Sequence, residues 1–325
     1  MKPLIFPPYS SEPARELTGM QREILRLKKE RNAVILAHNY VDEDIQAVAD
    51  FVGDSLGLSF CARDTDADAI VFCGVDFMAE TAKILNPGRA VLLPDASSGC
   101  SLEESCAPEE LAAFKAAHPG AFVVSYINCS AAVKALSDVI CTSGNAVDIV
   151  KNIPAGRKII FAPDKYLGSW VEEMTGRKMI LWDGCCCAHA AYTPGPIAAM
   201  RERLGAPVVC HPECPKPVRD VCDEVCSTEK MIKWAREHPS DTIIVATIFQ
   251  MIHRLRREVP EKTFVAAPLA GRDCQRCRHM DKNTLEKVRN CLRDMSPQIE
   301  VDPTIIGRAR EPIDLMLSWS APKAK

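Results

Sequence analysis

This sequence has no excess of charge of either sign and no long apolar run. Its 40 Lys and Arg residues nearly balance its 43 Asp and Glu residues, which leaves a formal net charge of −3 over 325 residues. A balanced charge gives no basic surface for nucleic acid. No apolar stretch approaches the roughly 20 residues of a membrane-spanning helix. The sequence therefore predicts a globular protein that binds neither nucleic acid nor a membrane.

The first residues also lack the apolar core of a signal peptide. They read Met1-Lys-Pro-Leu-Ile-Phe-Pro-Pro, with one early positive charge and only a short apolar stretch. We therefore expect the protein to reside in the cytoplasm. Low-complexity segments are absent too, and 47% of the residues are hydrophobic. A chain of this length and composition can form two or three compact units with buried cores.

Cysteine, in contrast, is abundant, with 16 residues. In a reducing compartment, thiols serve as small buried side chains, metal ligands or redox groups more often than as structural disulfides. Burial is the simplest interpretation for the cysteines in or beside apolar runs. These are Cys61, Cys73, Cys129, Cys141 and Cys291.

A pattern of three residue types occurs three times along the chain. His38, Tyr126 and His211 each end a short apolar run, and a hydroxyl residue follows 17 residues later in every case. A cysteine then closes each unit. The hydroxyls are Ser55, Ser143 and Thr228, and the cysteines are Cys100, one of Cys185, Cys186 and Cys187, and Cys277. Such spacing is typical of an internal repeat.

Each unit also contains two further apolar runs bounded by Gly, Pro or charge, as buried parallel strands are. The nine predicted strands fall at 34–37, 69–72, 90–93, 122–125, 159–162, 179–182, 207–210, 243–246 and 263–266. Helices are expected at 77–85, 166–174 and 251–258, with another set opening at the repeated hydroxyls. The sequence thus predicts an α/β protein of three small βαβ units whose strand ends converge on one central site.

The three unit-closing cysteines are candidate metal ligands. Three thiolates from three strand ends could hold an iron-sulfur cluster and leave one iron without a protein ligand, free to act as a Lewis acid. Zinc in a closed four-ligand site is an alternative, because compact pairs also occur at Cys210 and Cys214, Cys222 and Cys226, and Cys274 and Cys277. Spacing alone leaves iron-sulfur, zinc and no metal open.

The polar residues of the pattern suit an anionic substrate. Ser55, Ser143 and Thr228 precede helical stretches, so the simplest interpretation is that they cap the helix N-termini. A helix N-terminus also attracts phosphate and carboxylate groups. Candidate acids and bases cluster just beyond the first strands, where α/β proteins bind ligands. These are His38, Asn39, Tyr40, Tyr126, Asn128, His211 and Glu213, whereas His118, His238, His253 and His279 are expected to be solvated or structural.

Several ordered motifs make the chain resemble a known family. They include Ala37-His-Asn-Tyr, Tyr126-Ile-Asn, Thr142-Ser-Gly-Asn-Ala, Ala162-Pro-Asp-Lys-Tyr-Leu-Gly and His211-Pro-Glu-Cys. From about residue 33 to 288 the chain resembles quinolinate synthase, the A-protein of bacterial NAD biosynthesis. The resemblance implies three αβα sandwich domains with short parallel sheets, related by a pseudo-threefold axis around a central 4Fe-4S cluster. It also implies condensation of iminoaspartate with dihydroxyacetone phosphate to quinolinate, with release of phosphate and water.

The same resemblance implies residue roles. The cluster ligands would be Cys100, Cys186 and Cys277, with Cys186 chosen because the family ligand lies three residues before a histidine, here His189. Cys274 would form a redox pair with Cys277. Glu213 would abstract a proton and Tyr40 would deliver one, with His38 and His189 also catalytic. The substrate-binding residues would be Ser55, Tyr126, Asn128, Ser143, His211 and Thr228.

The predicted domains span 22–112, 113–200 and 201–290, followed by a C-terminal segment at 291–325. The resemblance also implies functional coupling to an aspartate oxidase or dehydrogenase that supplies iminoaspartate. Two positions depart from the family pattern, since Ile248 stands where Glu is usual and Ala190 where an acidic residue commonly follows His189. Two other classes stay open: a redox sensor that binds zinc or an iron-sulfur cluster, and a metal-free binding protein for a small dicarboxylate.

Overall fold

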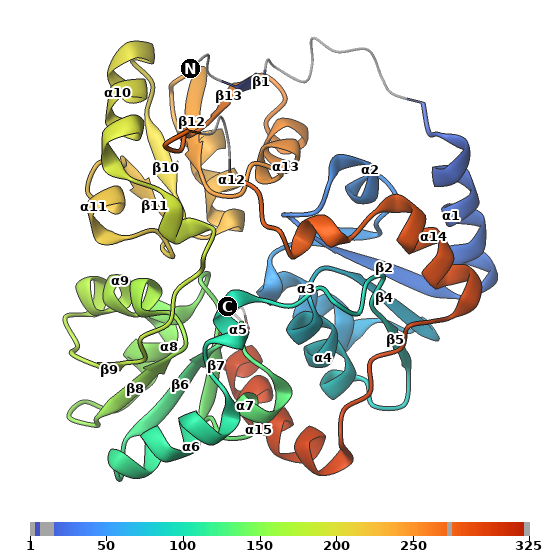
Figure 1. Ribbon diagram of the computed structural model, residues 1–325, viewed down its shortest axis with the longest axis horizontal. Helices are drawn as coiled ribbons and strands as arrows, with labels where there is room; N and C mark the ends of the chain where they lie inside the picture. The colour runs from blue at the N-terminus through green and yellow to red at the C-terminus, as the bar shows by residue number, and fades with distance from the viewer. Residues whose placement is uncertain (1–3, 7–15, 272–274, 322–325) are drawn as a thin grey trace.

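Three β-sheets, each in its own lobe, surround the centre of the molecule (Figure 1). The computed structural model describes residues 4–6, 16–271 and 275–321. In each lobe the first strand of the repeat lies inside the sheet and its carboxyl end points toward the centre, where the lobes meet. The prediction of an α/β protein built from three short parallel sheets is confirmed.

The first lobe contains a four-stranded parallel sheet in the order β3-β2-β4-β5. Its strands are β2 (Ala33–His38), β3 (Phe51–Gly53), β4 (Ala69–Cys73) and β5 (Ala90–Leu92). Its helices are α1 (Gly19–Glu30), α2 (Glu43–Gln46), α3 (Ser55–Asp64) and α4 (Asp76–Leu85).

The second lobe repeats this arrangement, with the strand order β7-β6-β8-β9. Its strands are β6 (Phe122–Tyr126), β7 (Val139–Cys141), β8 (Ile159–Ala162) and β9 (Ile180–Leu181). The helices are α5 (Ser101–Glu104), α6 (Pro108–Ala117), α7 (Ala131–Lys134), α8 (Ala146–Asn152) and α9 (Lys165–Thr175), and the 3-10 helix η2 (His189–Ala191) follows β9.

The third lobe has the order β1-β13-β12-β10-β11, in which β1 adds an antiparallel edge from the N-terminus. Its strands are β1 (Ile5–Phe6), β10 (Val208–Cys210), β11 (Glu224–Val225), β12 (Thr242–Ala246) and β13 (Thr263–Ala266). The helices are α10 (Pro194–Leu204), α11 (Lys216–Arg219), α12 (Thr228–Glu237), α13 (Met251–Glu258) and the 3-10 helix η3 (Met280–Lys282).

The last two helices return to the other lobes. Helix α14 (Leu285–Asp294) packs against α1 and β4 of the first lobe. Helix α15 (Pro303–Ser320) packs against α7, α8 and β7 of the second lobe and also touches α4 of the first. The C-terminal segment therefore ties two lobes together. The domain bounds expected from the sequence stay a prediction.

A partly or fully exposed aspartate contacts the first strand of every repeat in the same way. The carboxylates of Asp50, Asp138 and Asp223 accept the backbone N–H groups of Ile35, Val123 and Val208 at 2.8, 2.7 and 2.8 Å. The backbone N–H of each aspartate returns a hydrogen bond to the carbonyl of the same strand residue. In each case the two residues are 15 positions apart in the chain. This shared pair of hydrogen bonds shows that the three units are structural repeats.

All nine predicted strands are present, and the predicted helix at 251–258 coincides with α13. The sequence did not reveal β3, β7 and β11, the second strand of each repeat, or β1. These strands have only two or three residues. None of them lies in one of the four-residue apolar runs, so their pairing defines them: β3, β7 and β11 pair with the first strand of their repeats, and β1 pairs with β13.

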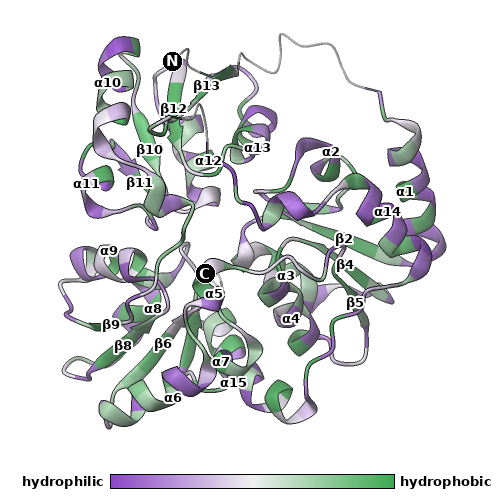
Figure 2. Cartoon of the chain, in the orientation of Figure 1, coloured by the Kyte–Doolittle hydropathy of each residue, from purple (hydrophilic) through white to green (hydrophobic). Residues whose placement is uncertain are grey.

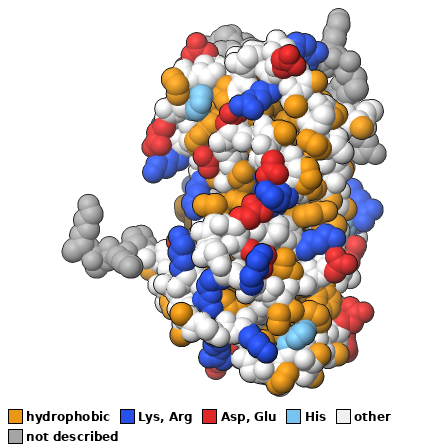
Figure 3. All heavy atoms as spheres, turned by 90° about the vertical axis from the view of Figure 1, so that its left-hand side faces the viewer, with side chains coloured by type: hydrophobic (Ala, Val, Ile, Leu, Met, Phe, Trp, Pro, Cys, Tyr) orange, Lys and Arg blue, Asp and Glu red, His pale blue; other side chains and the backbone are white. Residues whose placement is uncertain are grey.

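The strands are buried because each sheet has helices on its faces. Every residue of β4 is buried, as expected for a parallel strand covered on both sides. Figure 2 shows hydrophobic strands inside each lobe and hydrophilic positions on the outer helices. On the face in Figure 3, acidic and basic side chains are mixed, with no large area of one sign. Within the described residues, no helix has the length and apolar character needed to cross a bilayer.

The aspartate contact yields a stability prediction. Asp138→Ala would leave the N–H of the fully buried Val123 without its side-chain acceptor. We expect the free energy of unfolding to fall by about 1–3 kcal/mol. Urea denaturation followed by circular dichroism would measure it, with Asp66→Ala at an exposed position as the control. An Asp138→Ala variant as stable as the control would contradict this role.

Candidate active site

One cavity lies where the three lobes meet, and residues of all three lobes line it. The structure places thirteen of the sequence-predicted site residues on its lining, without Asn39. They are His38, Tyr40, Ser55, Cys100, Tyr126, Asn128, Ser143, Cys186, His189, His211, Glu213, Thr228 and Cys277. Residues far apart in the sequence therefore share one chamber, as expected when strand ends converge.

The three predicted ligand cysteines occupy equivalent loops. Each follows the last strand of its unit, and its carbonyl accepts the N–H of the residue four positions later. These bonds join Glu104 to Cys100 at 2.9 Å, Ala190 to Cys186 at 2.9 Å and Asp281 to Cys277 at 3.0 Å. Backbone N–H groups also donate to each sulfur, from residues two or three positions further along the chain. The loops are thus three copies of one local structure.

The three sulfurs also face one another. Burial raises the pKa of Cys186 well above its usual value, and the nearby Glu213, Cys100 and Cys277 add to the shift. Burial likewise raises the pKa of Cys100, and Cys277 contributes to that shift. Three half-buried thiols that oppose one another's ionisation form a site where a cation can replace the protons. Together with the N–H groups aimed at the sulfurs, this donor set fits an iron-sulfur cluster.

The three adjacent cysteines Cys185, Cys186 and Cys187 have different surroundings. Cys185 is half-buried and interacts with Lys165 and Asp164 outside the thiol group. Cys187 is exposed, although it also lines the cavity and lies near Cys277. Cys186 occupies the position equivalent to Cys100 and Cys277, so the geometry favours it as the third ligand.

The other cysteines considered for zinc lie near one another in the third lobe, where Cys210 interacts with Cys214, Cys222 and Cys226. Within the described ranges, the grouping of three or more metal-ligating side chains whose ligand atoms all lie within 4.8 Å of one another consists of Cys186, His189 and Glu213. The four thiols of the third lobe are not part of the cavity lining. Cys274 lies outside the described residues, and with it the redox pair expected with Cys277.

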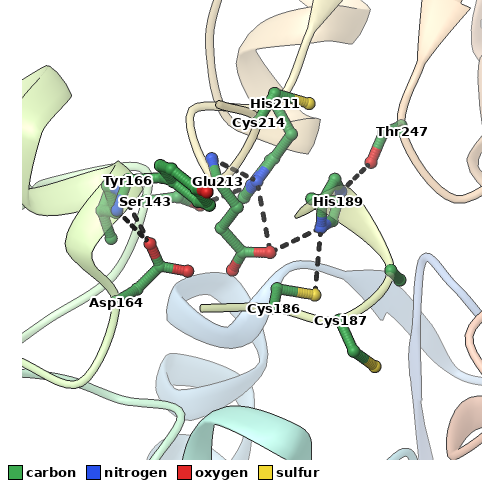
Figure 4. Close-up of polar contacts among 12 residues, drawn as sticks. Ser143, Asp164, Tyr166, Cys186, Cys187, His189, His211, Glu213, Cys214 and Thr247 are labelled. Carbon is green, nitrogen blue, oxygen red and sulfur yellow. Dashed lines mark hydrogen bonds and ion pairs between the residues drawn. The ribbon is translucent and has the colours of Figure 1, made fainter. Parts of the chain in front are cut away.

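Glu213 is the centre of the polar network (Figure 4). One carboxylate oxygen lies 2.6 Å from His189 Nδ1, and the other accepts the Tyr126 hydroxyl at 2.6 Å. Burial alone would raise the pKa of Glu213, but His189, His211 and these hydrogen bonds hold it below its usual value. The side chain is therefore a buried carboxylate, a group able to accept a proton.

The neighbouring side chains are neutral or protonated. Burial lowers the pKa of His38 to about 4 and that of His211 to about 3, so both rings are uncharged at neutral pH. Burial and the charge of Glu213 raise the pKa of Tyr40 and Tyr126 well above 10, so both phenols keep their protons. Asp54, whose pKa burial raises to about 6, also lines the chamber, which thus combines two carboxyl groups with several neutral hydrogen-bond donors.

The interpretation of the repeated hydroxyls as helix caps is wrong. Asp54 caps α3, while Ser227 and Asn145 occupy the N-cap positions of α12 and α8. The repeated hydroxyl residues lie beside those caps and face the cavity instead. Ser143 Oγ is 3.1 Å from His211 Nε2, and Thr228 Oγ1 accepts the Asn39 side-chain amide at 2.9 Å. Asp54 accepts the Gly57 N–H at the start of α3, whereas Ser227 and Asn145 make no side-chain cap hydrogen bond. Because the repeated hydroxyls do not cap these helices, they are available to a ligand.

The sequence missed several residues of the site. His279, expected to be solvated or structural, is buried and lines the cavity. An apolar wall is formed by Val75, Phe77, Met78, Ile248 and Met280. Thr247 and Asp164 follow β12 and β8, so they belong to the ends of strands other than the first in each repeat. That strand-end position is the signal that could have identified them.

Asp164 supports the loop that carries Cys186. One carboxylate oxygen accepts the N–H groups of Tyr166 and Leu167 at 2.7 and 2.8 Å and thereby caps α9. The carboxylate also accepts the N–H of Cys186. Its second oxygen is buried without a hydrogen-bond partner. Burial and the charge of Glu213 raise the pKa of Asp164 well above its usual value.

Comparisons with known proteins agree with this arrangement. A family model described as Quinolinate synthetase A protein matches residues 22–318. A curated quinolinate synthase of Synechococcus sp. is 50% identical over 301 residues, covering 92% of this chain and 94% of the relative. Quinolinate synthases of Trichodesmium erythraeum and Cyanophora paradoxa are 50% and 48% identical over 299 and 300 residues. They cover 91% and 92% of this chain, and 93% and 91% of the relatives.

The contacts of Asp164 predict different effects for two substitutions. Asp164→Ala removes the cap of α9 and the acceptor for Cys186 N–H, so we expect a loss of about 1–3 kcal/mol in stability. Asp164→Asn retains an oxygen acceptor and should lose clearly less. Thermal unfolding under anaerobic conditions would measure both variants. Equal losses for Ala and Asn would mean that the accepted hydrogen bonds are not the reason for burying this residue.

Proposed function

Because this chain belongs to the quinolinate synthase family, we propose that it catalyses the family reaction of NAD biosynthesis. In that reaction, iminoaspartate and dihydroxyacetone phosphate condense to quinolinate with release of phosphate and water. The observation that carries the proposal is the convergence of three equivalent cysteine loops and three sets of polar residues on one cavity. The resemblance expected from the motifs is confirmed by the family match.

The cofactor of this reaction would be a 4Fe-4S cluster held by Cys100, Cys186 and Cys277. When bound, such a cluster supplies a Lewis acid at the iron that lacks a protein ligand. The half-buried, mutually opposed thiols and the N–H groups directed at their sulfurs support this assignment.

The hydroxyls of the three repeats would anchor the anionic substrates. Ser55 and Thr228 stand at the first position of α3 and α12, two helices of ten residues each. The N-termini of these helices favour phosphate and carboxylate groups. Ser143 and Asn128 extend the set from the second lobe. Each lobe therefore contributes a polar group to the same substrate.

Glu213 is the proposed base and Tyr40 the proposed acid. Glu213 is a buried carboxylate held by His189 and Tyr126, so its free lone pairs can accept a proton from carbon next to a carbonyl or imine group. Tyr40 keeps its proton because burial raises its pKa, and its phenol lines the cavity. A proton held at the phenol oxygen can be delivered to a departing hydroxyl.

The two neutral histidines would act as oriented hydrogen-bond donors. His38 Nδ1 accepts the backbone N–H of Tyr40 at 3.2 Å, and His211 Nδ1 accepts that of Glu213 at 3.4 Å. In a neutral ring the proton then resides on Nε2. His211 directs this N–H toward Ser143, and His38 has the equivalent position in the first repeat. Both rings can therefore bind substrate oxygens.

Two alternative functions would require only some of these site residues. A redox sensor with zinc or an iron-sulfur cluster would need the thiols without the surrounding acid, base and hydroxyl groups. A metal-free dicarboxylate-binding protein would need the polar pocket without three opposed thiols. The proposed compartment is the cytoplasm, where a reducing environment keeps thiols free. An aspartate oxidase or dehydrogenase is the proposed source of iminoaspartate.

The ligand assignment predicts the outcome of cysteine substitutions. Cys100→Ser, Cys186→Ser and Cys277→Ser should each lose most of the bound iron and sulfide after anaerobic purification. Cys185→Ser and Cys187→Ser are matched controls in the same loop and should retain both. Iron, sulfide and zinc would be measured by elemental analysis and visible absorption. Zinc without iron in the wild type would reject the iron-sulfur assignment.

The base assignment predicts that Glu213→Gln retains the cluster and loses turnover by at least about 100-fold, because the amide cannot accept the proton. Quinolinate formation would be measured anaerobically with both substrates supplied. Glu202→Gln, on the exposed face of α10, is the control for the same chemical change. Near wild-type quinolinate formation by Glu213→Gln would exclude this residue as the base.

A further inference from the structure

Arg219 joins the third lobe to the second outside the cavity. It is the last residue of α11, which packs against α9 of the second lobe (Figure 1). Its side chain is 3% exposed, and it is not among the residues that line the cavity. The guanidinium donates to the carbonyl of Cys214 at 2.9 Å and to the carbonyl of Tyr166 at 3.1 Å. Cys214 belongs to the third lobe and Tyr166 to the second, so one side chain holds both.

The other terminal nitrogen of Arg219 binds two side chains of α9. It donates to Ser169 Oγ at 3.1 Å and to a carboxylate oxygen of Glu173 at 2.9 Å. A guanidinium presents its donors from three nitrogens in one plane, whereas a lysine offers all of its donors from a single nitrogen. The four contacts of Arg219 therefore fix α11 against α9 across the boundary between the lobes, in a geometry that lysine cannot reproduce.

The carbonyl of Cys214 ends the turn that carries the proposed base. The backbone N–H of Cys214 donates to the carbonyl of His211 at 3.0 Å, which closes the turn at 211–214. His211 and Glu213 of this turn both line the cavity. The contact from Arg219 therefore holds the end of the turn that presents Glu213 to the cavity.

The carbonyl of Tyr166 lies in the first turn of α9, beside the residue that supports the Cys186 loop. Asp164 accepts the backbone N–H of Tyr166 at 2.7 Å and also accepts the N–H of Cys186. Arg219 thus binds the same segment of the second lobe that holds the Cys186 loop. Through one side chain, the turn at 211–214 is tied to the start of α9.

We propose that Arg219 is a positioning residue for the reaction proposed above, on which this inference rests. It holds the turn at 211–214 against α9 and thereby sets where the Glu213 carboxylate meets His189 and Tyr126 of the second lobe. Each of those contacts is 2.6 Å long, so a small shift of the turn would weaken both. Without the guanidinium, the turn and α9 would lose their shared partner and could move independently of each other.

The expected consequence is kinetic. A residue that places the base without touching substrate affects the turnover number more than substrate binding. Loss of the guanidinium should therefore lower kcat and leave KM within about twofold. The iron content should stay at the wild-type level, because Arg219 contacts none of the three proposed ligand cysteines.

The test compares Arg219→Met with Arg177→Met in the cluster-containing enzyme. Arg219→Met keeps a long apolar side chain and removes the donors, so kcat should fall about 10- to 100-fold. Arg177 is the matched control, because its guanidinium also donates to backbone carbonyls, between residues 150 and 157, but all of them lie in its own lobe. Arg177→Met should lose stability and keep kcat within about twofold of wild type.

Hydrogen exchange followed by mass spectrometry gives a readout that does not depend on turnover. Peptides that contain the turn at 211–214 should exchange faster in Arg219→Met than in wild type, and at the wild-type rate in Arg177→Met. Iron content and thermal unfolding would be recorded for every variant. Should Arg219→Met fail to fold, Arg219→Lys and Arg177→Lys provide the same comparison with the charge retained.

A double-substitution cycle tests whether Arg219 acts through the base. In a Glu213→Gln background, Arg219→Met should add much less than its effect in the wild type. Full additivity, an unchanged exchange rate at 211–214, or a loss of kcat no larger than that of Arg177→Met would overturn the proposal. A wild-type protein that makes no quinolinate would instead refute the proposed reaction, so the two failures are distinguishable.

Discussion

The structure depends on one constraint: the first strand of each repeat must end at a common centre. The aspartate contact in every repeat holds this strand three positions before the residue that reaches the cavity, and the same carboxylate and backbone pair closes the segment between the first and second strands. His38, Tyr126 and His211 therefore reach the cavity from three directions, and the cysteine loops reach it from the last strand of each unit.

A buried carboxylate then links the lobes. Glu213 belongs to the third lobe, but its partners Tyr126 and His189 belong to the second. Asn39 of the first lobe likewise bonds to Thr228 of the third. A carboxylate inside protein is costly unless hydrogen bonds and positive charge compensate for lost water. The contacts that arrange the active site are thus also contacts between the lobes. The same residues therefore serve both the proposed chemistry and the packing of the lobes.

Helices α14 and α15, which follow the third sheet in the chain, pack on the first and second lobes. Helix α14 packs on the first lobe, and α15 spans from the second lobe to α4 of the first. The three units are consequently not independent bodies joined only at the cavity. This bracing keeps three cysteine loops from different sheets at fixed separations, which a cluster with three protein ligands requires.

The sequence by itself determined nine of the strands, the threefold repeat and thirteen of the residues that line the cavity. It could do so because spacing along a parallel strand fixes which residue stands at its end, and strand ends are where such sheets bind ligands. Periodicity could not identify β3, β7 and β11, because none of them lies in one of the four-residue apolar runs from which the other strands were predicted. The sequence also predicted the wrong role for Ser55, Ser143 and Thr228. A hydroxyl residue near the start of a helix has the same position in the sequence whether its side chain caps the helix or faces the cavity. Only the tertiary structure decided that His279 lies in the chamber and that Thr247 joins Tyr40 to His189. Those contacts connect residues separated by 207 and 58 positions in the chain. No local rule encodes them, because they exist only once three lobes have packed against one another.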